Sequence, residues 1–186
     1  HVPFWFAQAL AADDTPPLPP LQGEVSADVC IVGGGFTGLW TAILCQQARP
    51  DWRVIVLEKS RCGAGASGRN GGCMLTWSTK YLSLRQWFGD SEARRLVAAS
   101  EQAVQDIAQF CHTHQIDAEL RLGGAVYAAS QPAQIGRLDG VLAALDQMEA
   151  NRWQRLSNAD TQALTGSVQM QHGAWTDAAG SLQPGK

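Results

Sequence analysis

The apolar positions along this chain form two patterns, short continuous runs and runs with helical spacing. Together they predict a mixed α/β protein. An apolar run at residues 29–32, which follows Asp28, breaks into glycines, and apolar positions then resume with helical spacing as far as Ile43. A second short apolar run covers residues 54–57. Because short apolar runs on either side of a helical pattern are typical of parallel strands joined by a crossover helix, residues 27–58 are predicted to form a right-handed βαβ unit.

Beyond residue 78 the pattern changes to longer amphipathic helices and separate strands. Residues 91–114 carry apolar side chains at helical spacing and are predicted to form one helix, capped by Asp90 or Ser91. A second helix is predicted to begin at residues 130–132, with an apolar stripe that runs to Met148. The other predicted elements are strands at residues 117–122, 124–129 and 153–156, a short helix at residues 158–164, and a strand or turn at residues 168–175.

The N-terminal segment has a different composition. Residues 1–27 combine an aromatic and alanine-rich patch with the run Pro16-Pro-Leu-Pro-Pro20, which can be neither helix nor inner strand. We expect an extended arm on the surface of the domain. A proline-rich ligand for an SH3-type domain is the alternative interpretation.

Three glycines between the first predicted strand and helix form the pattern G-x-G-x-x-G at Gly33, Gly35 and Gly38. The first permits a sharp turn, the second lets a pyrophosphate approach the backbone, and the third lets the helix lie close to the strand. Unpaired N–H groups and the macrodipole at the start of the helix then favour an anion without a basic side chain.

An acidic residue stands where such a site requires one. Glu58 ends the second predicted strand, about twenty residues after Gly38, and its carboxylate can accept hydrogen bonds from both hydroxyls of an adenosine ribose. The spacing predicts a dinucleotide site, although glycines that serve only packing would give the same pattern. Lys59 and Arg61 could hold a 2′-phosphate or belong to a solvated loop.

Composition limits the other classes of function. The 186 residues are 45% hydrophobic, enough for a core of one domain or slightly more. A net charge of −3 and a pI near 5.8 give no basic face for nucleic acid, and no apolar run reaches the roughly 18 residues that span a membrane. The start, from His1, shows no secretory signal and suggests that residues are missing before it.

The cysteines and histidines indicate neither disulfides nor a metal site. Five scattered cysteines without a C-x-x-C pair suggest reduced thiols in a cytoplasmic protein. His112 and His114 lie two residues apart, and therefore on different faces of the predicted helix, so no metal site is predicted.

A second glycine-rich stretch follows Glu58 directly. Residues 62–74 read Cys-Gly-Ala-Gly-Ala-Ser-Gly-Arg-Asn-Gly-Gly-Cys-Met, so their backbone can pass close to a flat or anionic group. The alternative is a flexible loop, which the polar pair Arg69-Asn70 makes less convincing. After Met74, the aromatic residues Trp77, Tyr81 and Trp87 either pack in a core or roof a pocket.

These two glycine motifs make the chain resemble the N-terminal part of the FAD-dependent D-amino-acid oxidase and glycine oxidase superfamily, nearest to its γ-glutamylputrescine oxidoreductase-like members. The resemblance rests on residues 27–42, 56–59 and 65–72, and extends to Pro17-Leu-Pro-Pro-Leu21 and the terminal residues 179–186. It implies a Rossmann-like FAD-binding βαβ unit of the glutathione-reductase type, followed by the start of an α+β substrate domain. The expected division is an arm at 1–27, the FAD-binding part at 28–77 and the substrate part at 78–186.

The resemblance also assigns the cofactor site. It implies that the first motif binds the FAD pyrophosphate and that Glu58 binds the adenosine ribose, while the second motif passes along the pyrophosphate and the flavin. Arg69 would either stabilise a reduced, anionic flavin or meet a phosphate. The expected FAD-binding residues are Gly33, Gly35, Phe36, Thr37, Gly38, Glu58, Lys59, Ser67, Arg69, Asn70, Gly71 and Gly72.

The implied reaction is oxidation of a carbon–nitrogen bond in an amine or amino acid by hydride transfer to flavin. No catalytic residue is identified, and neither the substrate nor the reoxidant, oxygen or another acceptor, is fixed. Because relatives continue beyond this sequence, we expect a fragment or one of two chains. By itself it is expected to bind FAD weakly or not at all, and catalysis is expected to need the missing half. The alternatives are an NAD-dependent dehydrogenase and a non-catalytic flavoprotein subunit.

Overall fold

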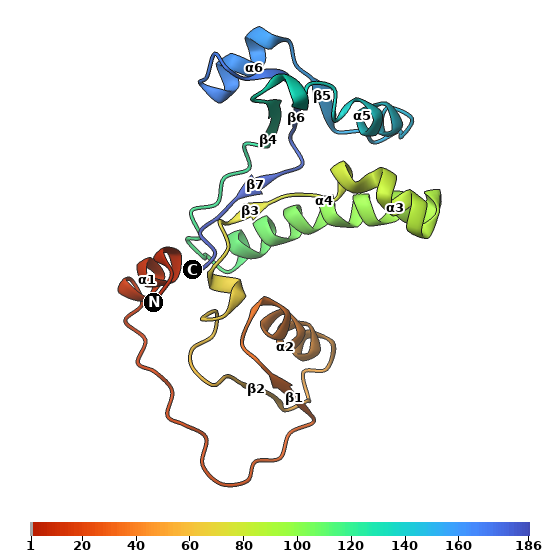
Figure 1. The fold of residues 1–186 in the computed structure, drawn as a ribbon. Coiled ribbons are helices and arrows are strands. Elements are labelled where there is room, and N and C mark those ends of the chain that lie inside the picture. Colours follow the sequence, from red (N-terminus) through yellow and green to blue (C-terminus); the bar gives the residue numbers. More distant parts are fainter. Residues whose placement is uncertain (1) are drawn as a thin grey trace. The chain divides into compact units, whose positions relative to one another are not determined.

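The computed structural model describes residues 2–186, which fall into two compact units. The first unit runs up to Gly72 and also includes Gln183–Lys186, and the second is Cys73–Leu182 (Figure 1). No helix within residues 2–186 is long and apolar enough to cross a membrane.

The first unit contains the predicted βαβ unit. Strands β1 (Val29–Val32) and β2 (Val54–Leu57) pair in parallel, with Val29 opposite Val54, and helix α2 (Phe36–Ala48) connects them. The Asp28 carboxylate accepts a hydrogen bond of 2.7 Å from the backbone N–H of Arg53, which fixes the start of the pair. A short 3-10 helix, η1 (Ala66–Gly68), follows within the second glycine motif.

The N-terminal arm is not wholly extended, so that part of the prediction is wrong. Residues Phe4–Ala11 form helix α1, which begins after Pro3 and ends before the proline-rich run. Alanine, leucine and glutamine are strong helix formers, and proline at the N-cap removes no helical hydrogen bond. Residues 13–27 contain no helix or strand, as expected for the proline-rich segment.

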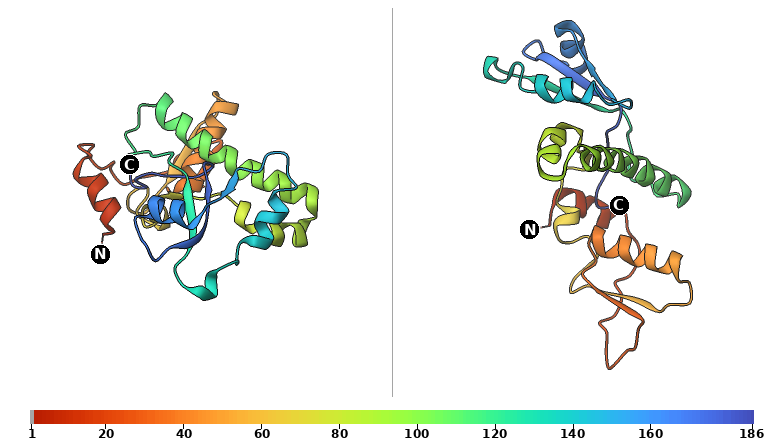
Figure 2. Two further views of the ribbon diagram at one scale, coloured as in Figure 1. Left: turned by 90° about the horizontal axis from the view of Figure 1, so that it is seen from above. Right: turned by 90° about the vertical axis from the view of Figure 1, so that its right-hand side faces the viewer.

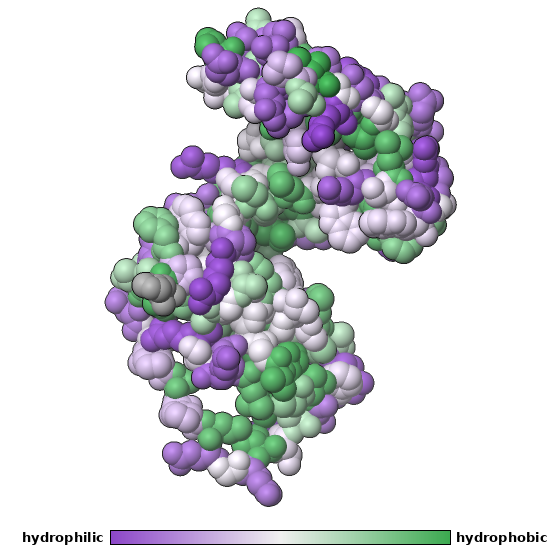
Figure 3. Space-filling view, viewed as in Figure 1, coloured by the Kyte–Doolittle hydropathy of each residue, from purple (hydrophilic) through white to green (hydrophobic). Residues whose placement is uncertain are grey.

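The βαβ unit leaves much of its apolar surface open. No residue of α2 is buried, and the side chain of Val32 is 86% exposed. Figure 3 shows apolar residues gathered over α2 and β1. The large exposed apolar side chains of these elements and of β2 are Val32, Phe36, Leu44 and Leu57.

The second unit is built on a three-stranded antiparallel sheet with the order β4 (Ala125–Ala129), β6 (Gln171–Thr176), β5 (Trp153–Arg155). A separate short pair joins β3 (Cys73–Met74) to β7 (Gly180–Ser181). The remaining elements are η2 (Ser78–Lys80), α3 (Tyr81–Phe88), α4 (Asp90–Thr113), η3 (Pro132–Gln134), α5 (Asp139–Leu145) and α6 (Asn158–Thr165). In Figure 2 the long helix α4 is unbroken.

The core of this unit lies where α3, α4 and α5 meet one face of the sheet. Tyr81 is 1% exposed, and its burial identifies it as a packing residue. Trp153 donates from its indole Nε1 to the hydroxyl of buried Ser78 at 2.9 Å. The buried apolar cluster consists of Tyr81, Leu84, Ala93, Val97, Val141, Leu142, Leu145, Trp153 and Ala174.

The long helix and the helix near residue 158 agree with prediction, but the N-cap of the long helix differs from the one predicted. The structure places Gly89 at the N-cap of α4, whereas Asp90 and Ser91 lie inside the helix. Gly89 has φ 82, a left-handed conformation that separates α4 from α3. Asp90 instead stabilises the first turn through the helix macrodipole. In α6, Ser157 is a side-chain cap, since its hydroxyl accepts from the N–H of Asp160 at 3.1 Å.

Two predictions in the second unit were wrong, and one helix was missed. Residues 117–122 form only an isolated bridge from Arg121 to Ser181, and the left-handed Glu119, with φ 51, interrupts any strand. The helix expected from residues 130–132 is split into η3 and α5 by Gly136, with φ 76. Helix α3 was not predicted, although it buries Tyr81 and Leu84.

Candidate dinucleotide-binding site

The turn between β1 and α2 has the geometry that its glycines predict. Gly33 has φ 107, and its N–H donates to the carbonyl of Leu57 at 2.8 Å, which ties the turn to the end of β2. A Cβ added to Gly38 would lie 2.0 Å from the carbonyl oxygen of Gly33. Side chains are therefore excluded at both positions, one by conformation and the other by close approach.

The start of α2 presents hydrogen-bond donors. Within residues 2–186, no acceptor is found for the backbone N–H groups of Gly35, Thr37 and Gly38. Gly35 is the N-cap, and a helix of 13 residues adds the positive end of its macrodipole there. The arrangement can bind an anion such as a pyrophosphate through backbone groups alone.

Glu58 lies at the same edge of the parallel pair. Its carboxylate accepts from the backbone N–H of Gly34 at 2.9 Å and from that of Ser60 at 3.0 Å. The bond from Gly34, followed by that from Ser60, holds the pKa of Glu58 below its ordinary value of 4.5. A carboxylate has about four acceptor positions, so the charged group retains acceptors for a pair of hydroxyls.

The structure brings the second glycine motif against the first. The hydroxyl of Ser67 accepts from the N–H of Phe36 at 2.8 Å, and the N–H of Gly63 donates to the carbonyl of Gly34 at 2.8 Å. Cys62 lies over Gly34, where an added Cβ would be 2.5 Å from its sulfur. Residues that are about thirty positions apart therefore form one cradle around the start of α2.

Polar side chains of the second motif shape its own loop. Asn70 donates to the carbonyl of Ser67 at 2.6 Å and accepts from the N–H of Gly72 at 2.8 Å. Arg69 is exposed and donates from Nε to the carbonyl of Ala64 at 3.2 Å. Gly72 has φ 73, whereas no atom lies within 4 Å of a Cβ added to Gly71. The loop is therefore held by its own backbone and side chains.

The remaining predicted residues lie at the rim. Phe36, Thr37 and Lys59 are exposed, and Lys59 contributes a positive field that favours the charged form of Glu58. The sequence interpretation missed Gly34, which packs beneath Cys62 and supplies the N–H that Glu58 accepts. Of the three consecutive glycines, Gly33 and Gly35 were assigned to the motif, but Gly34 between them was not.

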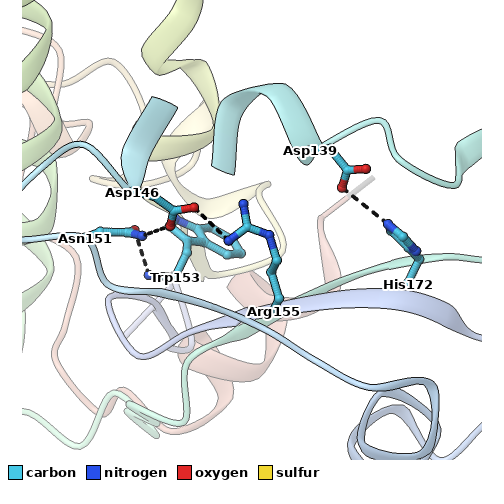
Figure 4. A network of polar contacts seen from close by, with 6 residues as sticks. All are labelled: Asp139, Asp146, Asn151, Trp153, Arg155 and His172. Atoms are coloured by element: carbon cyan, nitrogen blue, oxygen red, sulfur yellow. Dashed lines mark hydrogen bonds and ion pairs between the residues drawn. The ribbon is translucent and has the colours of Figure 1, made fainter. Parts of the chain in front are cut away.

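The second unit contains a separate polar network at the face of its sheet (Figure 4). Arg155 pairs with Asp146 at 2.8 Å, and Nε2 of His172 lies 3.3 Å from Asp139. A cavity of about 360 Å³ lies beside them, between the sheet and the segment from Gln134 to Leu142. Within residues 2–186, no group of three or more histidine, cysteine or acidic residues could hold a metal ion.

A parallel βαβ turn, an acidic residue at the second strand and an attached glycine loop define the class of dinucleotide-binding oxidoreductases. The chain belongs to the FAD-dependent oxidoreductase family DAO, which matches residues 28–186, and FAD is the cofactor of that family. Both the predicted family and the predicted fold class are confirmed. γ-Glutamylputrescine oxidoreductase of Escherichia coli strain K12 is 34% identical over 157 residues, which are 84% of this chain and 34% of that protein.

Solved structures show the same fold. Glycine oxidase from Bacillus cereus ATCC 14579 matches 86% of this chain with a TM-score of 0.64 and 14% identity. L-Amino acid deaminase from Proteus vulgaris matches 90% with a TM-score of 0.66 and 18% identity. The chain covers 42% of each of these structures, and about a third of the curated relative.

Proposed function

We propose that this chain supplies the FAD-binding part of an oxidoreductase that oxidises a carbon–nitrogen bond in an amine or amino acid. The observation that carries the proposal is the joining of the two glycine motifs at the start of α2, through Ser67 and the N–H of Phe36 at 2.8 Å. A nicotinamide-dependent enzyme needs the turn and the acidic residue but not this second loop. Membership of the FAD family supports flavin over NAD.

The residues fit the parts of FAD in chemical terms. The N–H groups of Gly35, Thr37 and Gly38 would bind the pyrophosphate, and the charged Glu58 would accept the ribose hydroxyls. Ser67, Asn70, Gly71 and Gly72 would place the second loop along the cofactor. Arg69, an exposed cation whose Nε is held by Ala64, would meet a phosphate or the reduced flavin.

The substrate class is inferred from the named relatives. A putrescine derivative, glycine and L-amino acids appear in their names, and all carry an amino nitrogen on a carbon that can be oxidised. When bound, the flavin accepts the hydride from that carbon. The contribution of this chain is to bind and orient the cofactor, since no acid–base pair is required when the amine arrives neutral.

We further propose that residues 28–77 form part of the FAD-binding domain and that residues 78–186 begin the substrate domain. The exposed apolar side chains of β1 and α2 support a need for further polypeptide, from a longer chain or from a companion. Residues 1–186 alone would then bind FAD weakly. We also propose a cytoplasmic location, which the five free thiols support.

The test is the flavin content of the protein expressed from its full reading frame. After denaturation, the supernatant is expected to contain about one FAD per chain. Glu58→Ala is expected to lower this ratio, whereas Glu24→Ala, a change of an exposed acidic residue in the same unit, should not. A flavin-free protein that binds NAD would support a nicotinamide dehydrogenase instead.

The substrate class needs a second measurement on the same preparation. Addition of a reactive amine or amino acid without oxygen should bleach the flavin absorption band, and admission of oxygen or another acceptor should restore it. Bound FAD that no amine or amino acid reduces would contradict the proposed substrate class. FAD that appears only after a companion chain is added would instead identify this chain as a subunit.

A further inference from the structure

Helix α1 lies against the second glycine motif, although its sequence carries no nucleotide-binding residue. The ring of Phe6 is 8% exposed and lies 3.5 Å from a Cβ added to Gly63 and 3.2 Å from one added to Gly68. Phe4, on the same helix, is 70% exposed. One aromatic residue of the pair is therefore packed on the loop, and the other is open to solvent.

The C-terminal segment of the chain holds α1 in this position. Gln183 is 3% exposed, and its side-chain amide donates to the carbonyl of Trp5 at 2.8 Å and to the side-chain oxygen of Gln8 at 3.2 Å. Gly185 is close to α1 as well, since a Cβ added there would lie 3.1 Å from the Cβ of Ala9. A buried amide with these partners holds the helix in place, because moving the helix would leave the amide without a hydrogen-bond partner.

The two glycines under Phe6 are the ones that shape the loop around Ser67. The N–H of Gly68 donates to the carbonyl of Gly63 at 2.9 Å, which closes the turn that contains Ser67. The N–H of Gly63 donates to Gly34 of the first motif. Movement of this turn would therefore displace the Ser67 hydroxyl from Phe36 and open the cradle at the start of α2.

We propose that α1 is a positioning element of the cofactor site and that Phe6 couples its docking to the binding of FAD. The ring of Phe6 approaches Gly63 and Gly68, which are not among the residues predicted to contact the cofactor. Phe6 acts through these two glycines, which hold Ser67 in place. Because coupling between two sites is reciprocal, docked α1 raises the affinity for FAD, and bound FAD stabilises docked α1 by the same factor. The inference rests on the proposed function, because it assumes that the ligand is FAD.

The first test compares Phe6→Ala with Phe4→Ala in the protein expressed from its full reading frame. After removal of bound flavin, the Kd for added FAD is measured by quenching of flavin fluorescence. Phe6→Ala is expected to weaken binding by about 5- to 150-fold, the range typical of coupled sites. Phe4→Ala, the exposed control, should leave the Kd unchanged, and Phe6→Leu should recover most of the affinity because it keeps apolar contact with the loop.

The second test measures amide hydrogen exchange of α1 with and without FAD. In the wild-type protein, FAD should slow exchange in residues 4–11, none of which is among the residues predicted to bind it. In the Phe6→Ala variant this protection should be largely lost. The melting temperature of the apo protein separates the proposal from simple unfolding, since FAD binding is measured well below the transition of each variant.

Each outcome decides between the alternatives. An unchanged Kd in Phe6→Ala, or equal protection of α1 by FAD in both proteins, would overturn the proposed coupling while leaving the FAD assignment intact. If the wild-type protein binds no FAD, the proposed function and this inference both fail. Weaker binding by Phe6→Ala and Phe4→Ala alike would point to general destabilisation of the helix and would also overturn the role of Phe6.

Discussion

The two units differ in the contacts that hold their structure. In the first, no residue of α2 is buried, and the geometry of the site comes from backbone contacts such as that between Gly38 and Gly33. In the second, α4 buries Ala93, Val97, Val104 and Cys111, and the sheet is covered by a continuous apolar core. The candidate dinucleotide-binding site therefore lies in the unit with little core, and the larger core lies in the unit without a nucleotide motif.

From this difference we expect that substitutions can change stability and cofactor binding separately. Burial of apolar area stabilises at about 25 cal/mol per Å², so the second unit carries the larger share of the hydrophobic stabilisation. The first unit depends on a few positions at which only glycine fits. The following substitutions test this separation, beginning with the largest expected effect.

Removal of core volume should destabilise the protein without a specific effect on the cofactor site. Leu145 is 2% exposed, and Leu145→Ala is expected to cost about 2–5 kcal/mol of stability because it leaves a cavity. Urea denaturation measures the loss. Leu164→Ala, at a position 59% exposed in the same unit, is the control and should cost far less. Equal losses in both variants would contradict the assigned core.

A side chain introduced at the close approach in the glycine turn should instead act mainly on FAD binding. Gly38→Ala places a Cβ 2.0 Å from the carbonyl oxygen of Gly33, and relief of such a clash costs about 1–3 kcal/mol. Because the strain falls on the anion-binding turn, the purified variant should lose most of its FAD. Gly140→Ala in α5, where the nearest atom to a new Cβ is 4.0 Å away, should retain it.

Removal of a buried hydrogen bond in the second unit should cost about as much stability as Gly38→Ala, but without loss of FAD. Ser78→Ala leaves the indole N–H of Trp153 without its acceptor, at a cost of about 1–3 kcal/mol. Thermal unfolding measures the loss, and near-ultraviolet circular dichroism reports on the tryptophan. Ser91→Ala, at an exposed position, is the matched control. Loss of FAD affinity by Ser78→Ala below its unfolding temperature would contradict the expectation that stability and cofactor binding change separately.

The pH dependence of FAD binding should be the mildest effect. Backbone hydrogen bonds from Gly34 and Ser60 lower the pKa of Glu58, so its charged form is favoured in the folded protein. The contribution of the Glu58 charge to FAD binding is therefore fully present at a pH above the ordinary pKa of 4.5. It is lost only as the pH falls through the lowered pKa. FAD affinity should stay constant from about pH 5 to 8 with respect to this group. In Glu58→Gln, the acid-dependent loss should disappear.

The sequence predicted those features that depend on local chemistry. Gly33, Gly35, Gly38 and Glu58 were enough to define the βαβ turn, because each occupies a position with a strict conformational or chemical requirement. The helix α4 was also predicted, since its apolar spacing persists over many turns. These signals do not need knowledge of distant partners.

Features that depend on tertiary contacts could not be predicted in the same way. Helix α1 was not predicted, because its packing depends on tertiary contacts. Phe6 packs on Gly63 and Gly68, which lie far along the chain. Gly34 has no signal of its own beside two motif glycines, and its requirement comes from Cys62 above it. The strand expected at residues 117–122 was lost to a left-handed residue, Glu119, that is not a glycine.

The hydrogen bonds of Asn70 also affect the chemical ageing of the protein. Asn70 precedes Gly71, and an asparagine before glycine is readily deamidated, because the following backbone nitrogen can attack the side-chain amide. Here that amide is held at both ends, by the carbonyl of Ser67 and the N–H of Gly72. Deamidation would replace a donor with a negative charge in the loop beside the anion site. We therefore expect the ordered loop to slow deamidation of Asn70, and expect protein stored with a loosened loop to accumulate aspartate and isoaspartate there.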